Sequence, residues 1–121
     1  MITSSRHRRA QLRSLSRELR AHNRARKLVA TGAPQAARTH LIAAGLDTAT
    51  AQRFAAAFSR NVLPTARRDT RIKLTGRTTA RVSVKLYSRE TFAARLAVYR
   101  PRDAHYARLF ARTANRALEA A

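Results

Sequence analysis

The balance of charge restricts this chain more than any other feature of its sequence. Its 121 residues include 26 lysines and arginines, of which 23 are arginine, but only 6 aspartates and glutamates, so the formal net charge is +20. Like charges at this density oppose compaction unless a partner of opposite sign neutralises them. We therefore expect basic side chains on the surface, a modest core and a polyanionic partner.

Nucleic acid is the polyanion that this composition favours. A guanidinium group holds a phosphate or a guanine edge with two hydrogen bonds, whereas lysine presents a solvated point charge. A GC-rich genome could also favour arginine, because arginine and the 26 alanines both use GC-rich codons, but it does not explain the scarcity of acids. An anionic membrane or protein surface is the alternative partner.

Length and composition predict one soluble domain. Hydrophobic residues make up 45% of the chain, with 4 phenylalanines and 3 tyrosines, which indicates closely packed alanine-rich helices. The absence of cysteine excludes a disulfide framework and a thiolate zinc site. No apolar run has the length of a signal peptide or approaches the roughly 18 residues of a membrane span. We expect a cytoplasmic protein with no membrane partner.

Helical periodicity covers the first half of the chain. Residues 4–30 contain no proline or glycine and place Leu12, Leu15 and Leu19 on one narrow apolar face. The density of like charges predicts that residues 1–10 form a flexible basic arm. Shorter helices are predicted over residues 34–44 and 49–62, the second capped by Asp47 or Thr48.

From Thr70 the apolar period changes to two, which predicts a β-hairpin. A two-residue loop would place Leu74 opposite Thr79 and Ile72 opposite Arg81, and so would mix the apolar and polar faces. We therefore predict an odd-numbered loop, with Leu74 opposite Ala80 and Ile72 opposite Val82. The other face then collects Arg71, Lys73, Arg81 and Lys85, with Arg77 at the tip.

Two further helices are predicted after the hairpin, capped by Ser88 and Asp103. The apolar stripe of the last helix contains Tyr106, Leu109, Phe110, Ala114 and Ala117. The fold class is thus α+β and mainly helical, with three helices, a hairpin and a C-terminal helical pair at residues 88–121. The pair carries more apolar surface than the preceding residues need to bury, so it could form a homodimer interface.

Residues 45–54 have the pattern of the turn and second helix of a helix-turn-helix. Gly45 suits the turn, Leu46 the apolar position after it, Asp47 the cap, and Ala51 and Phe54 the seat of the second helix. The same short pattern also occurs in plain helical hairpins. Together with the basic hairpin that follows, residues 11–87 resemble winged helix-turn-helix DNA-binding domains, in which the hairpin is the wing.

The resemblance implies how the domain would meet duplex DNA. The helix at residues 49–62 would enter the major groove, with base contacts from Thr48, Ala49, Gln52 and Arg53. Phosphate contacts are expected from the arm, the end of that helix and the wing. They are Arg6, Arg8, Arg9, Arg13, Arg60, Arg67, Arg68, Arg71, Lys73, Arg77, Arg81 and Lys85.

Catalysis finds little support in the sequence. The four histidines are scattered among few acids, so we expect no catalytic residue, no metal and no cofactor. Glu18 is expected to offset the charge of neighbouring arginines. A metal-independent ribonuclease that uses arginine with Tyr87 and His105 is the enzymatic alternative.

The leading hypothesis is a small duplex-DNA-binding protein that acts as a regulator, a recombination accessory factor or a DNA-organising factor. A structural RNA-binding or ribosome-associated protein is the first alternative. A protein that coats or packages nucleic acid without reading its sequence is the second.

Overall fold

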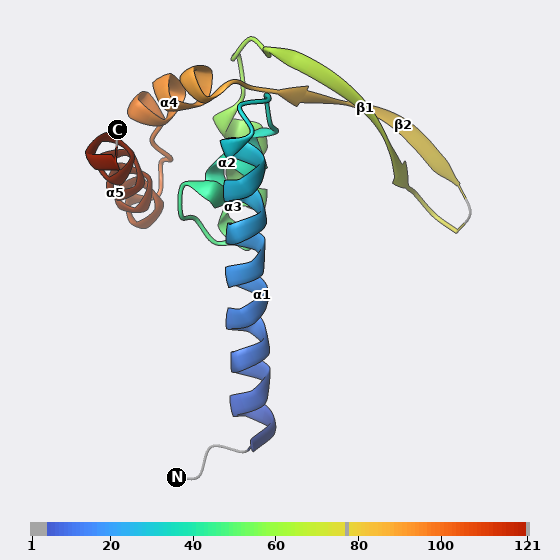
Figure 1. The fold of residues 1–121 in the computed structure, drawn as a ribbon, viewed down its shortest axis with the longest axis vertical. Helices are drawn as coiled ribbons and strands as arrows, with labels where there is room; N and C mark the ends of the chain where they lie inside the picture. The colour runs from blue at the N-terminus through green and yellow to red at the C-terminus, as the bar shows by residue number, and fades with distance from the viewer. Residues whose placement is uncertain (1–4, 77, 121) are drawn as a thin grey trace.

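A computed structural model describes residues 5–76 and 78–120 (Figure 1). This part of the chain is mostly helical and has one two-stranded antiparallel sheet, so the predicted α+β class is confirmed. The elements follow the predicted order of three helices, a hairpin and two helices. They are α1 (Ser5–Ala30), α2 (Ala37–Ala43), α3 (Thr48–Phe58), β1 (Ala66–Lys73), β2 (Thr79–Leu86), α4 (Arg89–Val98) and α5 (Ala104–Ala120).

The core lies where α2, α3, α4 and α5 meet. Leu41, Ala51 and Phe110 are fully buried there, and the Phe58 ring centroid lies 5.2 Å from that of Tyr99. The C-terminal helices therefore share one core with α2 and α3, and most of their apolar surface is used within the chain. Ala117, expected on the buried stripe of α5, is exposed.

Local capping signals form as the sequence predicts. Asp47 accepts a hydrogen bond from the Thr50 backbone N–H (3.1 Å) at the start of α3, and Ser88 does the same for Thr91 at the start of α4. Gly45 has a φ of 117° in the turn between α2 and α3, a conformation that suits glycine. The turn therefore has the backbone geometry that its sequence indicates.

Two helix boundaries differ from the prediction for reasons of pairing and backbone geometry. The second helix begins at Ala37 rather than Pro34, because Gln35 pairs with Tyr87 in an isolated antiparallel bridge. The third helix ends at Phe58 rather than at residue 62. Asn61 adopts a φ of 62°, which is incompatible with a continuing right-handed helix.

The first helix corrects two expectations. It begins at Ser5, so residues 5–10 of the expected flexible arm are helical, although all are exposed; residues 1–4 lie outside the described part. The predicted apolar face is also exposed, with Leu12, Leu15 and Leu19 at 60–67%. The packing face is a different one, centred on the buried Ala25, because contact with the rest of the chain starts only near residue 18. The N-terminal half of α1 projects from the body (Figure 1).

The hairpin is longer than predicted and its register is shifted. The first strand starts at Ala66 rather than Thr70, and Ile72 lies opposite Ala80, not Val82. The backbone N–H of Leu74 donates to the Thr78 carbonyl, so Leu74 pairs two residues away from its predicted partner Ala80. The shift is even, so the two faces keep their predicted character. The hairpin also projects from the body (Figure 1).

Candidate nucleic-acid interface

The carboxylates are placed where they leave the basic side chains uncompensated. Glu18, Asp47 and Asp103 all accept hydrogen bonds at helix N-termini, and Glu90 lies in the first turn of α4. In the residues described, no ion pair joins an arginine or lysine to a carboxylate. Negative charge at a helix N-terminus stabilises that helix. Four of the six acids thus stabilise helix N-termini and form no ion pair with the described basic side chains.

Helix α1 carries a continuous basic face that the sequence analysis did not recognise. At 100° per residue, seven basic side chains spaced three or four residues apart fall within about 80° of the helix circumference. They are Arg6, Arg9, Arg13, Arg17, Arg20, Arg24 and Lys27. All are exposed, and they extend over about 32 Å of the helix. The alternation of three- and four-residue spacings was the signal that could have revealed this α1 basic face.

The expected phosphate contacts on α1 divide between two faces. Arg6, Arg9 and Arg13 belong to the α1 basic face, whereas Arg8 lies on the side of the exposed leucines. Like charges three or four residues apart destabilise an isolated helix. A bound polyanion would remove that repulsion along the whole α1 basic face.

The hairpin carries a second basic face. Its pairing places Arg71 directly opposite Arg81 and Arg67 opposite Lys85, with Lys73 on the same side. Like charges directly opposite each other destabilise a sheet, and the only acid on this face is Asp69, opposite Ser83. The expected Arg71, Lys73, Arg81 and Lys85 therefore do share one exposed face, which we call the hairpin basic face.

Arg67 also belongs to the hairpin basic face, and the three remaining phosphate candidates lie elsewhere. Arg68, opposite Val84, is on the other side of the sheet. Arg60 is exposed just beyond α3. Arg77, expected at the hairpin tip, lies outside the described residues.

The exposed face of α3 is narrow. Ala49 and Gln52 are exposed as expected, and Ala56 lies between them and the end of the helix. Thr48 is held from outside the helix, because its backbone N–H and hydroxyl donate to the Glu18 carboxylate at 3.0 and 2.5 Å. The carboxylate of Glu18 thus joins α1 to α3 instead of offsetting neighbouring arginines, and Thr48 is committed to that contact.

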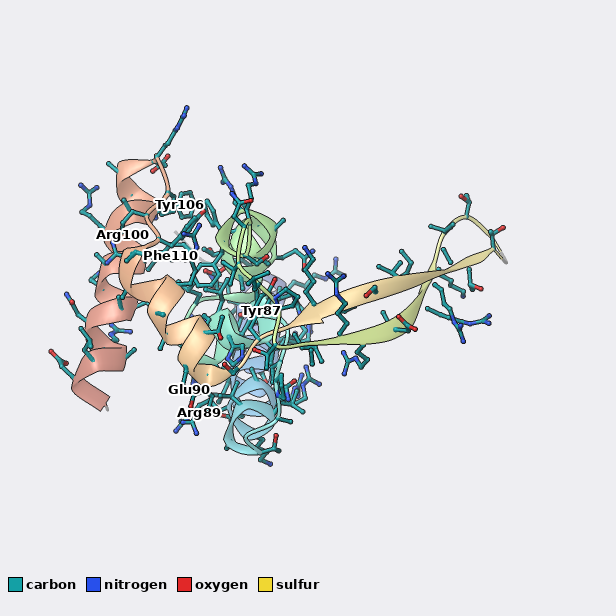
Figure 2. The ribbon with its side chains drawn as sticks, turned by 90° about the horizontal axis from the view of Figure 1, so that it is seen from above. Tyr87, Arg89, Glu90, Arg100, Tyr106 and Phe110 are labelled. Carbon is teal, nitrogen blue, oxygen red and sulfur yellow. The ribbon has the colours of Figure 1, made fainter. Side chains whose placement is uncertain are left out.

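Arg53 is exposed on α3 but held by α5. Its Nη1 donates to the Tyr106 hydroxyl at 3.2 Å, and its guanidinium carbon lies 4.8 Å from the Tyr106 ring centroid. Tyr106 and Phe110 lie on the side of α5 that faces α3 (Figure 2). A guanidinium held on an aromatic ring loses less conformational freedom when it binds a ligand.

Buried polar contacts fix the hairpin to the body. The carbonyl of Tyr87, at the end of β2, accepts hydrogen bonds from His40 Nε2 (2.7 Å) and from the Gln35 backbone N–H (3.0 Å). The His40 ring stacks on Phe92 with centroids 4.8 Å apart. His40 was not a predicted site residue, and it orients the hairpin relative to α2 and α4.

The burial of Tyr87 argues against the alternative of a ribonuclease that uses Tyr87 and His105. Tyr87 is 4% exposed, and its side chain lies in the core at the base of the hairpin (Figure 2). Because its hydroxyl is buried, it is not available to a substrate alongside the exposed His105. Among the described residues no group of three or more histidines and acids could hold a metal ion.

Comparisons with protein-family models, with curated proteins and with solved structures find no match to this chain. In the described part, none of the helices is both long enough and apolar enough to cross a lipid bilayer.

Proposed function

We propose that this protein binds duplex DNA through the α1 basic face, the hairpin basic face and the exposed side of α3. One observation carries the proposal: four of the six acids lie at helix N-termini, and the arginines and lysines of the described residues form no ion pairs. Phosphates are the groups that such a surface satisfies best, since each contact releases a counterion. The two projecting elements, α1 and the hairpin, would contact phosphates beyond the body of the protein (Figure 1).

The arrangement around α3 supports the winged helix-turn-helix form of this proposal. The turn at Gly45, the buried Leu46 and the capping Asp47 lie between α2 and α3, and a basic hairpin follows. An isolated antiparallel bridge between Gln35 and Tyr87 joins the segment between α1 and α2 to the residue that follows β2. In this form Gln52 and Arg53 face the major groove, and the hairpin is the wing.

The test compares a residue on α3 with one on the wing. Arg53→Ala should cost about 1 to 3 kcal/mol on a preferred duplex and relax preference at one position, because a fixed guanidinium reads a base edge. Arg81→Ala should weaken all sequences by a similar factor. Both variants are measured on a preferred duplex, selected from random sequences, and on a scrambled one. An equal loss on both duplexes for Arg53→Ala would remove the base-reading role.

Binding without sequence readout is the second candidate, and the composition of α3 favours it. The exposed side of α3 offers two alanines beside Gln52 and Arg53, while Thr48 is held by Glu18. In that case the protein coats nucleic acid through phosphates alone. Competition among duplex DNA, single strands and structured RNA separates these functions: a preference for structured RNA would instead favour an RNA-binding protein.

A further inference from the structure

A cleft of about 520 Å³ opens between α1, α2, α4 and α5, among residues not assigned to duplex binding. Arg26, Arg89 and Arg116 enter its lining from three different helices, together with His22. The remaining wall is apolar and includes Val29 and Phe92. A volume in this range, with a few polar groups converging on an apolar wall, is typical of ligand sites.

The three guanidinium groups have no partner in the described part of the chain. None forms a hydrogen bond or an ion pair there. Glu90, next to Arg89 at the N-terminal end of α4 (Figure 2), is exposed and is not part of the cleft lining. Three positive charges that converge without a carboxylate repel one another, and an anion between them would remove that repulsion.

Packed helices position the residues that line the cleft, and the side chains of Arg26, Arg89 and Arg116 are exposed along it. His22 Nδ1 donates to the Ile42 carbonyl at 2.9 Å, which fixes the ring between α1 and the end of α2. Arg116 extends from α5 toward the turn after α2, since its Nη1 lies 4.0 Å from where a Cβ on Gly45 would be. Arg89 begins α4, where the helix dipole adds positive potential. The cleft is thus formed by packed helices and not by a loop.

We infer that this cleft binds a ligand that carries two or more phosphate groups. Guanidinium groups hold phosphate oxygens with paired, charge-assisted hydrogen bonds, and three of them from separate helices match more than one phosphate. The phosphates come either from a free nucleotide or from neighbouring positions on a nucleic-acid backbone. Only the second source depends on the proposed function.

The first experiment uses inorganic pyrophosphate and no nucleic acid. Calorimetric titration compares the wild-type protein with the double variant Arg89→Gln/Arg116→Gln. The matched control is Arg108→Gln/Arg112→Gln, which removes the same charge from exposed α5 positions outside the cleft. The cleft variant should bind pyrophosphate at least about tenfold more weakly than the wild-type protein, and the control variant should lose much less of its affinity. Equal losses would show general charge attraction and overturn the inference.

A second variant keeps the test independent of folding. Arg26→Gln removes the charge that α1 contributes to the cleft, and it should also weaken pyrophosphate binding. Circular dichroism checks that this variant keeps its native helix content. A variant that keeps both its fold and its full affinity for pyrophosphate contradicts the site.

The source of the phosphates follows from duplex binding measured on the same variants. If the cleft variant reduces the salt dependence of duplex binding more than the control does, the ligand is backbone phosphate. If duplex binding falls equally in both while pyrophosphate binding is lost only in the cleft variant, the ligand is a free nucleotide. Loss of duplex binding in α3 or hairpin variants bears on the proposed function alone.

Discussion

His40 is a residue whose protonation is coupled to folding. It is 2% exposed, it donates to the Tyr87 carbonyl, and its ring stacks on Phe92. Burial, the largest influence, and the charge of Arg89 lower the pKa of His40 below its usual value of 6.5, although the hydrogen bond to Tyr87 acts in the opposite direction. The folded protein therefore favours a neutral imidazole at this position.

The sign of the pH effect follows from that direction. As the pH falls through about 6.5, the unfolded chain protonates this histidine and the folded protein resists, so the free energy of unfolding decreases. Above that pH His40 is neutral in both the folded and the unfolded protein, so its contribution to the free energy of unfolding does not change with pH. Urea unfolding at about pH 7.5 and about pH 5.5 should show this loss in the wild-type protein and a smaller loss in His40→Gln. His105→Gln, at an exposed site, is the control. An unchanged pH dependence in His40→Gln would contradict the assignment.

A lower range of pH reports on a different residue. Burial raises the pKa of Asp47, but hydrogen bonds from the Thr50 hydroxyl and backbone outweigh it, so the pKa lies below 3.8. The stability that this carboxylate contributes is complete above its unfolded pKa and is lost as the pH falls further. The two titrations are therefore separated on the pH scale.

Among the elements, the hairpin combines a strained charge arrangement with a binding role. Arg71 and Arg81 are opposite each other, so Arg71→Thr should stabilise the free protein by up to about 0.5 kcal/mol while it weakens duplex binding. Lys73→Thr is the matched control, because Lys73 faces Thr79 and has no like charge opposite it. It should weaken binding without stabilising the fold. Thermal unfolding and duplex titration measure the two effects, and a destabilised Arg71→Thr would be evidence against repulsion at this pair.

Helix α1 contributes affinity without contributing to the core over its first half. Deletion of residues 1–9 should weaken binding to every sequence alike and leave the melting temperature nearly unchanged, because residues 5–17 are all exposed. Single substitutions test whether the α1 basic face is the side that binds. Arg13 lies on that face and Arg8 lies outside it, so Arg13→Gln should reduce the affinity more than Arg8→Gln does. Loss of cooperative unfolding after the deletion would mean that this segment packs against the body.

For the whole molecule, binding should be governed by counterion release. If about 6 to 10 phosphates are neutralised, the slope of log K against log salt on duplex DNA should be roughly −5 to −9. Titrations at several salt concentrations measure it. A slope shallower than about −2 would show that most of the +20 charge is not engaged with phosphate.

Dimerisation through the C-terminal helices stays a prediction. These helices expose less apolar surface than the sequence led us to expect. Phe92, Tyr99 and Phe110 lie within the shared core, and the large apolar side chains left exposed on these helices are Val98 and Leu118. The exposed leucines of α1 form a larger apolar surface than Val98 and Leu118 do. The largest exposed apolar surface on a helix is therefore on α1 and not on the C-terminal helices.

Several features were determined by the sequence itself because they depend on near neighbours. The caps at Asp47 and Ser88, the turn at Gly45 and the alternation that forms the hairpin each involve residues a few positions apart. Side-chain hydrogen bonds to the next backbone turn and the two-residue period act over that range. The charge imbalance likewise needs only composition, so a polyanionic partner could be proposed before any fold was known.

Tertiary structure alone decided which surfaces are covered. Glu18 meets Thr48 across 30 positions of sequence, and the pairing of Gln35 with Tyr87 sets where α2 begins. The leucine face of α1 stays exposed because no other described element reaches that part of the helix, although its periodicity is that of a buried face. Amphipathic spacing shows that a face is apolar, but burial requires a second surface brought to it by contacts distant in sequence. For the same reason only the fold could bring Arg26, Arg89 and Arg116 to one cleft.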